Sequence, residues 1–303
     1  MSNVYKTRVL DELRRRFGEV HRLSGSQSLF SVGADAAIVY FRYSKVHEGG
    51  KTFFGLRDVD LKQLEGRNSF VCFLLDDGTS PVLIPYADFE AVFRASDPAS
   101  DGQHKVQLIS QDDTWQLYIA KQGRFSVEGY IGLALLEQSL DATRLRPDCG
   151  LSHSQVQSLL AGVGHLKGYD VRVPDSDIGR LDWAMTPRFT TAKQIPSGFD
   201  EVSNVLSEVD VLWIGTGSNR IEGLFEVEHS TPVYSGLLRF NDILLTEPRL
   251  SRFHIVANDL RRAVFSRQIS RPTFRKSGLS ELVSFLEYAN VLSWHARLIP
   301  DQA

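Results

Sequence analysis

The hydrophobic pattern of the first 125 residues begins with a helical period and continues as short apolar runs. Apolar residues at helical spacing predict an amphipathic helix over Tyr5–Phe17, with Gly18 as its stop. The runs that follow predict strands in pairs and short helices between them. The predicted strand pairs are Ala36–Tyr43 with Lys51–Gly55, Ser69–Leu75 with Pro81–Ile84, and Val106–Ile109 with Trp115–Ala120, and the predicted helices are Val59–Leu64 and Tyr86–Phe93. This order predicts an α+β domain with a mostly antiparallel sheet.

The second half of the chain alternates helical and strand patterns. A predicted apolar helix, Ile131–Leu140, precedes Asp141–Ser152, which combines proline, glycine and charge. We therefore predict two domains, residues 1–140 and 150–303, separated by that stretch. The elements predicted beyond it are helices at Ser154–Leu166, Val233–Leu245, Asp259–Ile269 and Ser280–Leu292, strands at Tyr169–Val173, Val209–Ile214, Ile221–Val227 and Phe253–Ala257, and a long loop at Arg180–Ser197. They predict an α/β domain in which helices flank a mixed sheet.

The composition is that of an ordinary globular protein. With 42% hydrophobic and 23% charged residues, the 303 residues can form two cores, which excludes a disordered or collagen-like chain. The net charge of −3 gives no overall positive field for nucleic acid. Cys72 and Cys149 form no disulfide framework or metal-ligand spacing, so we expect reduced thiols. No window approaches 18 apolar residues, so we expect a cytoplasmic protein without a membrane partner.

Three acidic residues interrupt apolar segments of the second half. Asp210 begins an apolar strand, and Glu226 and Glu228 lie two residues apart in the next one, so they share a face. A hairpin would bring Asp210 beside Glu226, and buried unpaired carboxylates cost several kcal/mol each. Mg²⁺ would relieve that cost, since it takes one or two carboxylates, a carbonyl such as that of Val227, and water as ligands. The alternative is the solvent face of an edge strand, although apolar segments on both sides favour a central strand.

The same segment contains DVLW and, after a hairpin, FEVEHSTPVYSGLLR. An Asp, a hairpin, an acid-x-acid strand and a helix resemble the PD-(D/E)xK, or restriction-endonuclease-like, nucleases. The longer phrase resembles a type II restriction endonuclease branch, over Leu151–Arg275. The resemblance implies a divalent-metal-dependent endonuclease of restriction type. Such an enzyme hydrolyses double-stranded DNA with metal-activated water.

The resemblance also implies roles for individual residues. Asp210 and Glu226, with the carbonyl of Val227, would bind Mg²⁺, for which Mn²⁺ would substitute. Glu228 stands where most members have lysine, and it would bind a second metal ion or accept the proton of the water. Related nucleases often supply another glutamate from their first helix, but Ser154–Leu166 contains no acidic residue.

Basic residues are concentrated just beyond this segment. From Arg239 to Lys276 there are nine basic residues and three acidic ones. Arginine suits phosphate and guanine because its planar guanidinium binds them through two hydrogen bonds. Arg239 is the strongest DNA-binding candidate. The other candidates are Tyr234, Ser235, Arg261, Arg262 and Arg271. For any one arginine, the alternative is an ordinary solvated helix surface.

The first half contains no catalytic set, but its strands carry aromatic and basic residues. The aromatic residues are Tyr40, Phe41, Tyr43, Phe53 and Phe54. They could help to recognise DNA, or they could belong to a packed sheet with ordinary surface charge. A recognition domain beside a nuclease is an expectation from fold-level association.

Three partners follow from the restriction interpretation: double-stranded DNA, a second copy of the chain, and a companion DNA methyltransferase acting on the same site. A homodimer is expected because a double-strand cut needs two active sites. Two other functions fit the same sequence. One is a repair or structure-specific nuclease of the same fold, and the other is a catalytically silent DNA-binding or regulatory protein.

Overall fold

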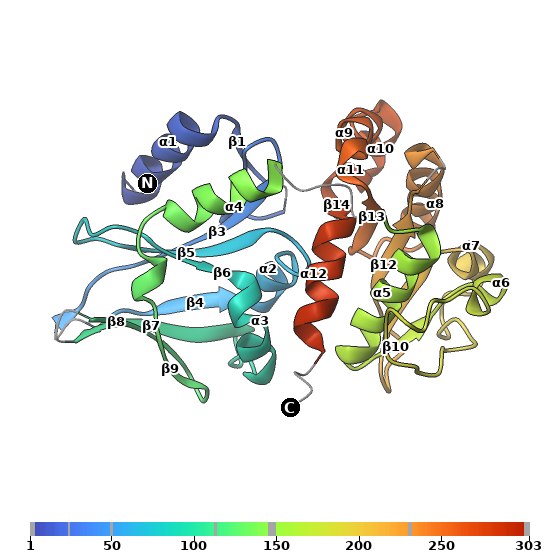
Figure 1. Ribbon diagram of the computed structural model, residues 1–303, viewed down its shortest axis with the longest axis horizontal. Coiled ribbons are helices and arrows are strands. Elements are labelled where there is room, and N and C mark those ends of the chain that lie inside the picture. Colours follow the sequence, from blue (N-terminus) through green and yellow to red (C-terminus); the bar gives the residue numbers. More distant parts are fainter. Residues whose placement is uncertain are drawn as a thin grey trace. The chain divides into compact units, whose positions relative to one another are not determined.

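The structure is a computed structural model that describes residues 4–23, 25–48, 51–111, 114–144, 150–229 and 232–299. The chain divides into two compact units, Met1–Arg146 and Pro147–Ala303 (Figure 1). Each unit has two buried apolar cores of its own. The cores of a unit lie on the two faces of a β-sheet.

The first unit is an α+β body, as predicted. One sheet has the strand order β1-β2-β3-β5-β6 and another has the order β4-β7-β8-β9. All pairings in them are antiparallel except that of β3 with β5. The elements are α1 (Val4–Phe17), β1 (Val20–Arg22), β2 (Leu29–Val32), β3 (Ala37–Ser44), β4 (Phe54–Arg57), α2 (Asp58–Lys62), β5 (Ser69–Leu75), β6 (Val82–Pro85), α3 (Tyr86–Ala95), β7 (Gln103–Gln111), β8 (Thr114–Ile119), β9 (Gly123–Ser126), η2 (Glu128–Tyr130) and α4 (Ala134–Arg144).

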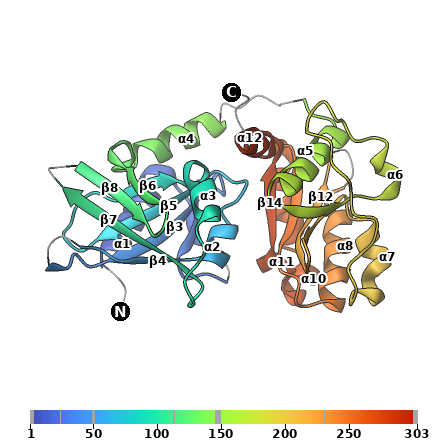
Figure 2. The same cartoon turned by 90° about the horizontal axis from the view of Figure 1, so that it is seen from below.

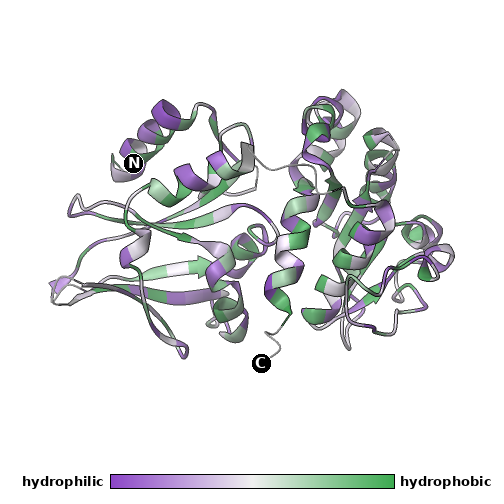
Figure 3. Ribbon diagram, in the orientation of Figure 1, coloured by the Kyte–Doolittle hydropathy of each residue, from purple (hydrophilic) through white to green (hydrophobic). Residues whose placement is uncertain are grey.

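Both faces of the first sheet are buried. Along β3, Val39 and Phe41 pack with α1 and α4, whereas Ile38 and Tyr40 pack with the second sheet, α2 and α3. The unit is therefore layered, with α1 and α4 on one face of the β3–β5 sheet and the β4–β7 sheet on the other (Figure 1). The visible side of α1 is largely hydrophilic (Figure 3).

One prediction for this unit is wrong, and one helix begins later than predicted. β3 and β4 do not form a hairpin, because β3 pairs with β2 and β5 while β4 pairs with β7 in the other sheet. A strand that is buried on both faces is central and takes neighbours on both edges. The predicted helix at Ile131 begins three residues later, since Ile131 forms a bridge with Val82 and Gly132 has a φ of 87°.

Most of the aromatic residues considered for DNA contact lie in the core. Tyr40, Phe41 and Phe54 are at most 3% exposed, whereas Tyr43 and Phe53 are 36% and 54% exposed. Tyr43 and Phe53 are therefore the two of these five that DNA could reach. For the other three, the packed-sheet alternative is correct.

The second unit has helices on both faces of one mixed sheet, as predicted. Its order is β10-β11-β12-β13-β14, antiparallel from β10 to β12 and parallel from β12 to β14. The elements are α5 (His153–Leu166), β10 (Tyr169–Arg172), α6 (Asp175–Ile178), η3 (Asp200–Val202), α7 (Ser203–Ser207), β11 (Val211–Gly215), β12 (Ile221–Val227), α8 (Val233–Thr246), β13 (Phe253–Ala257), η4 (Asp259–Arg261), α9 (Arg262–Ile269), α10 (Pro272–Ser277), α11 (Leu279–Leu282), β14 (Val283–Glu287) and α12 (Tyr288–Leu298).

Alternating strand residues build the two cores of this unit. Phe225 and Val227 of β12 pack with α5 and α12, whereas Leu224 packs with α8 on the other face. In Figure 2, α5 and α12 lie together on one side of the sheet and α8, α10 and α11 lie on the other. This arrangement buries β12 on both faces and at both edges.

The predicted helix Ser280–Leu292 is wrong. The structure divides this segment into the end of α11, the strand β14 and the start of α12. β14 pairs in parallel with β13, which lies about 30 residues earlier in the chain. Its short apolar run is compatible with either a helix or a strand, so the hydrophobic pattern could not distinguish them.

Two predictions from composition concern the cysteines and the membrane. Cys72 is a free, fully buried thiol whose pKa is raised by burial, and Cys149 lies outside the described residues. Within the described ranges, every helix is too short or too polar to cross a membrane.

Candidate active site

The β11–β12 hairpin places Asp210 opposite Glu226. Val211 pairs with Phe225, and the residue before it, Asp210, accepts a hydrogen bond from the Val227 N–H at 2.7 Å through Oδ2. β12 is the middle strand of the five-stranded sheet. The edge-strand alternative for this segment is therefore wrong.

Glu226 and Glu228 lie on the same face of β12, beneath α8. Both residues are 3% exposed. Gly236 of α8 lies over both side chains, and its N–H donates to Glu228 Oε1 at 3.1 Å. Glu228 thereby accepts a hydrogen bond from a backbone amide near the start of α8.

Glu226 is a buried carboxylate with a partner at only one oxygen. Its Oε2 lies 2.5 Å from Arg239 Nη1, while no described residue hydrogen-bonds its buried Oε1. Burial and, after it, the charge of Asp210 raise the pKa of Glu226, Arg239 opposes the shift, and the net result is a pKa of about 8. The charged form of Glu226 is therefore disfavoured despite its contact with Arg239.

We expect this carboxyl to make the stability of the metal-free protein depend on pH. Glu226 has a pKa of 4.5 when unperturbed and about 8 in the folded chain. Its stabilising contribution is thus complete below pH 4.5 and is lost as the pH rises through 8. The free energy of unfolding should fall by roughly 2–4 kcal/mol more in the wild type than in Glu226→Gln between about pH 5 and pH 8.5.

Chemical denaturation in EDTA at a series of pH values measures this difference. Other groups titrate in both proteins, so subtracting the Glu226→Gln curve from the wild-type curve removes their contributions. Parallel curves for the two proteins would contradict the raised pKa of Glu226.

Sequence reasoning missed three residues that surround Asp210. His153, the first residue of α5, places Nε2 3.4 Å from Asp210 Oδ2. One turn later, Gln157 Nε2 donates to the Asp210 carbonyl at 3.0 Å and to Asp177 Oδ2 at 3.1 Å. A polar glutamine within the apolar stripe of α5 was the one local signal of this network.

The surroundings of His153 are acidic. Its hydrogen bond with Asp210 raises its pKa, burial opposes that shift, and the charges of Asp210, Asp177 and Glu228 add to it. Ser152 caps α5 by accepting a hydrogen bond from the Gln155 N–H at 3.3 Å, and Gln155 Oε1 accepts one from the Ser152 N–H in return. The capping box fixes the start of α5 and therefore the position from which His153 reaches Asp210.

The donor chemistry of the site fits a hard divalent cation. Asp210 and Glu226 supply carboxylate oxygens, their charges oppose each other, and Glu226 Oε1 is buried without a partner. Among the described residues, no group of three or more His, Cys, Asp or Glu side chains is arranged to hold a metal ion. In the present arrangement Glu226 contacts Arg239 and Asp210 contacts the Val227 amide.

Three of the candidate arginines contact carboxylates or backbone carbonyls of the protein. Arg239 lies between Glu226 and Glu208, at 2.5 and 3.7 Å. Arg261 Nη1 donates to the carbonyls of Glu228 and His229, at 2.8 and 2.7 Å. Arg262 forms ion pairs with Asp259 and with the buried Glu287. Arg261 and Arg262 thus anchor the ends of strands beside the carboxylates.

The remaining candidates are Tyr234 and Ser235, in the first turn of α8, and Arg271, which precedes α10 and contacts Tyr234. Arg271 is exposed, and its guanidinium carbon lies 4.4 Å from the centroid of the Tyr234 ring. Ser235 Oγ donates to the Pro232 carbonyl at 2.7 Å. His229 stacks on Tyr288, with ring centroids 6.2 Å apart.

Gly236 is the position where α8 approaches the two glutamates most closely. A Cβ atom there would lie 2.6 Å from Glu228 Oε1, 3.1 Å from Ile255 Cδ1 and 3.2 Å from Glu226 Cβ. Alanine is about 1 kcal/mol better than glycine in an open helix, but here it must displace the carboxylate from its amide partner. We expect Gly236→Ala to lower the free energy of unfolding by about 1–3 kcal/mol.

A double-mutant cycle identifies the cause of that loss. In a Glu228→Ala background the obstructing oxygen is absent, so Gly236→Ala should cost much less. Equal costs in the two backgrounds, measured by urea denaturation, would show that Glu228 is not the obstacle.

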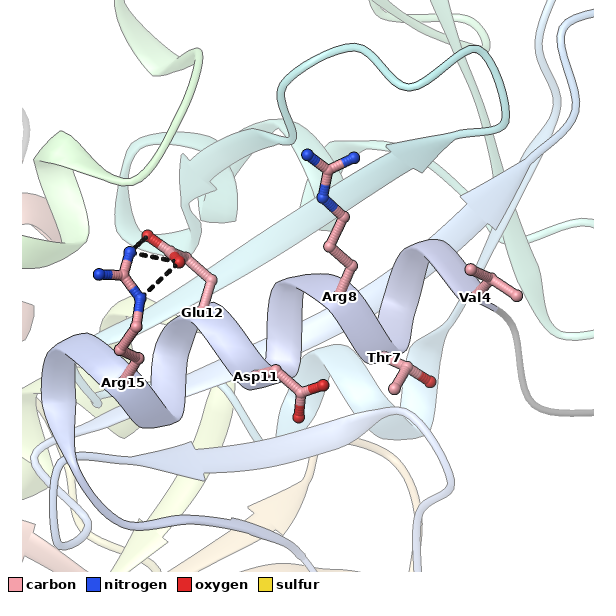
Figure 4. A pocket seen from close by; sticks show the side chains of 6 residues that line it. All are labelled: Val4, Thr7, Arg8, Asp11, Glu12 and Arg15. Atoms are coloured by element: carbon pink, nitrogen blue, oxygen red, sulfur yellow. Dashed lines mark hydrogen bonds and ion pairs between the residues drawn. The ribbon is translucent and has the colours of Figure 1, made fainter.

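In the first unit, an open hollow of about 620 Å³ follows one helix, α1. It is lined by Val4, Thr7, Arg8, Asp11, Glu12 and Arg15. Figure 4 shows Arg8, Glu12 and Arg15 on one side of the helix, with Thr7 and Asp11 on the other. Glu12 and Arg15 form an ion pair of 2.6 Å, as neighbours on a solvated helix commonly do.

Comparison with protein families gives a match over residues 135–298, more than half of the chain. The matching family model is the type II restriction enzyme NmeDI C-terminal domain. The matched residues include α5, the β11–β12 hairpin and α8, and thus all the carboxylates and arginines of the candidate site. No curated protein and no solved structure matches the chain.

Proposed function

The chain belongs to the family of the type II restriction enzyme NmeDI C-terminal domain, and from this membership we propose that it is a divalent-metal-dependent DNA endonuclease of restriction type. The observation that carries the proposal is the placement of Asp210 opposite Glu226, whose buried Oε1 has no hydrogen-bond partner among the described residues. The order of Asp210, hairpin, Glu226, Glu228 and α8 supports assignment to the PD-(D/E)xK nucleases.

Each residue of the site has a proposed task. Asp210, Glu226 and the carbonyl of Val227 would hold Mg²⁺, or Mn²⁺ in its place. The bound ion acidifies water and neutralises charge that develops on the phosphate. Glu228 keeps α8 against the site through its hydrogen bond with Gly236, which favours a positioning task over binding of a second ion.

The start of α8 is the proposed phosphate-binding surface. Helix N-termini favour anions because their first amides lack partners and point outward. Tyr234, Ser235 and the exposed Arg271 lie there, and Arg239 follows one turn later. Arg261 and Arg262 support this surface by holding the adjacent strand ends.

Cleavage of phage DNA tests the proposal. Purified full-length protein is incubated with unmethylated and CpG-methylated DNA, with Mg²⁺, Mn²⁺ or EDTA. We expect discrete fragments in either metal, none in EDTA and none with Asp210→Ala. Asp170→Ala replaces an exposed acidic residue of the same sheet, on β10, and should cleave like the wild type.

Other results of the cleavage experiment would support one of the two alternative functions. Nicking confined to branched or damaged DNA would indicate a repair or structure-specific nuclease. Binding without cleavage in any metal would indicate a silent DNA-binding or regulatory protein. A difference between the two DNA preparations would show which methylation state is cleaved, and hence whether a companion methyltransferase protects the site.

A homodimer is proposed from the chemistry of double-strand cleavage. Light scattering of the protein with and without a cleaved duplex measures the number of copies. A monomer that makes double-strand cuts without pairing on DNA would contradict this part of the proposal.

A further inference from the structure

We propose that His153 is a nitrogen ligand of the same metal site, and that it makes the site favour first-row transition metals over Mg²⁺. This inference rests on the proposed metal-dependent function and adds to it the class of cation. It gives the role of a metal ligand to a residue of α5, a helix that contains no acidic residue.

The distance between His153 and Asp210 suits two ligands of one ion. Ligands at about 2.1 Å from a metal lie about 3.0 Å apart at octahedral angles and about 3.4 Å apart at tetrahedral angles. His153 Nε2 lies 3.4 Å from Asp210 Oδ2. The two atoms can therefore share an ion with little movement of either side chain.

Two features keep the imidazole at this position. The capping box at Ser152 fixes the first turn of α5, and Gln157 ties the same helix to the backbone of Asp210 at 3.0 Å. His153 has a side chain that is 36% exposed, whereas that of Asp210 is 15% exposed. The imidazole is therefore more accessible from solvent than the Asp210 carboxylate.

Glu226 supplies an independent indication that a ligand belongs here. Its Oε1 is buried and has no partner among the described residues. One nitrogen and several oxygens would then surround the ion. Imidazole nitrogen binds Co²⁺, Ni²⁺ and Zn²⁺ more strongly than it binds Mg²⁺, which prefers oxygen.

Calorimetric titration of the DNA-free, full-length protein with Co²⁺ and with Mg²⁺ tests the assignment. For His153→Ala and His153→Gln we expect Co²⁺ affinity to fall by about 10–100-fold and Mg²⁺ affinity by less than about 3-fold. The visible absorption spectrum of the Co²⁺-loaded wild type should also change in both variants. His165→Ala is the matched control, because His165 lies on α5 and stacks on Phe189.

The outcomes separate this inference from the proposed function. Equal losses for Co²⁺ and Mg²⁺, or no loss for either, would overturn the ligand role of His153. If Asp210→Asn abolishes binding of both ions in the same experiment, the metal site itself stands. If Asp210→Asn leaves both ions bound, the proposed site and the ligand role fail together.

Discussion

Replacement of Glu226 by glutamine is expected to remove DNA cleavage while leaving the fold intact. Glutamine has the same shape, but it cannot offer a charged oxygen to a cation. We expect divalent-metal affinity to fall at least about 100-fold and the cleavage rate at least about 1,000-fold, because metal-based charge stabilisation is lost.

The fold should tolerate this change because of the electrostatics of the site. Burial raises the pKa of Glu226 to about 8, so at pH 7 and without metal its carboxyl is mostly neutral, as an amide is. Arg239 keeps Glu208 as a second partner and is partly exposed. Because the unfolded wild-type carboxyl is ionised at pH 7 and glutamine is not, we expect the free energy of unfolding in EDTA at pH 7 to be at least as high in Glu226→Gln as in the wild type.

Calorimetry, a cleavage time course and urea denaturation on the same preparation measure the three quantities. Glu222→Gln is the control, since Glu222 is also on β12 but pairs with Arg220 at 3.5 Å at the far end of the strand. Normal metal affinity in Glu226→Gln would exclude Glu226 as a ligand. A large loss of stability would instead show that its main task is structural.

Local sequence information was sufficient for the carboxylate set. Asp210, Glu226 and Glu228 belong to one hairpin, so strand alternation and a short turn predict their placement. The same reasoning succeeded for the β5–β6 hairpin, whose two strands are joined by a short turn that includes Gly78. In these cases the partner strand is the next one along the chain.

Predictions failed where the partner is distant in sequence. β4 pairs with β7, some 50 residues away, and β14 pairs with β13 across three intervening helices. Periodicity indicates that a segment is a strand or a helix, but it contains no information about its neighbour. The contact between His153 and Asp210 also joins residues that are far apart in sequence, 57 positions, so periodicity could not predict it.

The number of arginines does not show what each of them contacts. A count of basic residues indicates phosphate binding, yet Arg239, Arg261 and Arg262 contact carboxylates or carbonyls of their own unit. Buried acidic groups need counter-charges, and nearby arginines supply them. Sequence alone cannot separate an arginine that neutralises the protein from one that contacts DNA.

Replacement of Arg239 by glutamine is expected to affect metal binding and cleavage in opposite directions. Without DNA, Arg239 holds positive charge 2.5 Å from Glu226 Oε2, where it repels an incoming cation. Its removal should increase Mg²⁺ affinity several-fold. With DNA, loss of a phosphate contact beside the reacting group should lower the cleavage rate by about 100–1,000-fold.

These opposite changes follow if Arg239 changes partner during the reaction, from Glu226 in the metal-free site to a phosphate oxygen once metal and DNA are bound. Titration with Mg²⁺ in the absence of DNA and single-turnover cleavage measure the two effects separately.

Arg249→Gln is the matched control, because Arg249 packs on Phe199 and pairs with Glu247 instead. Arg239→Lys should restore part of the cleavage rate, since a lysine keeps the charge without the two-pronged hydrogen bond. If Arg239→Gln weakens metal binding as much as cleavage, Arg239 orients Glu226 for the ion and does not compete with it.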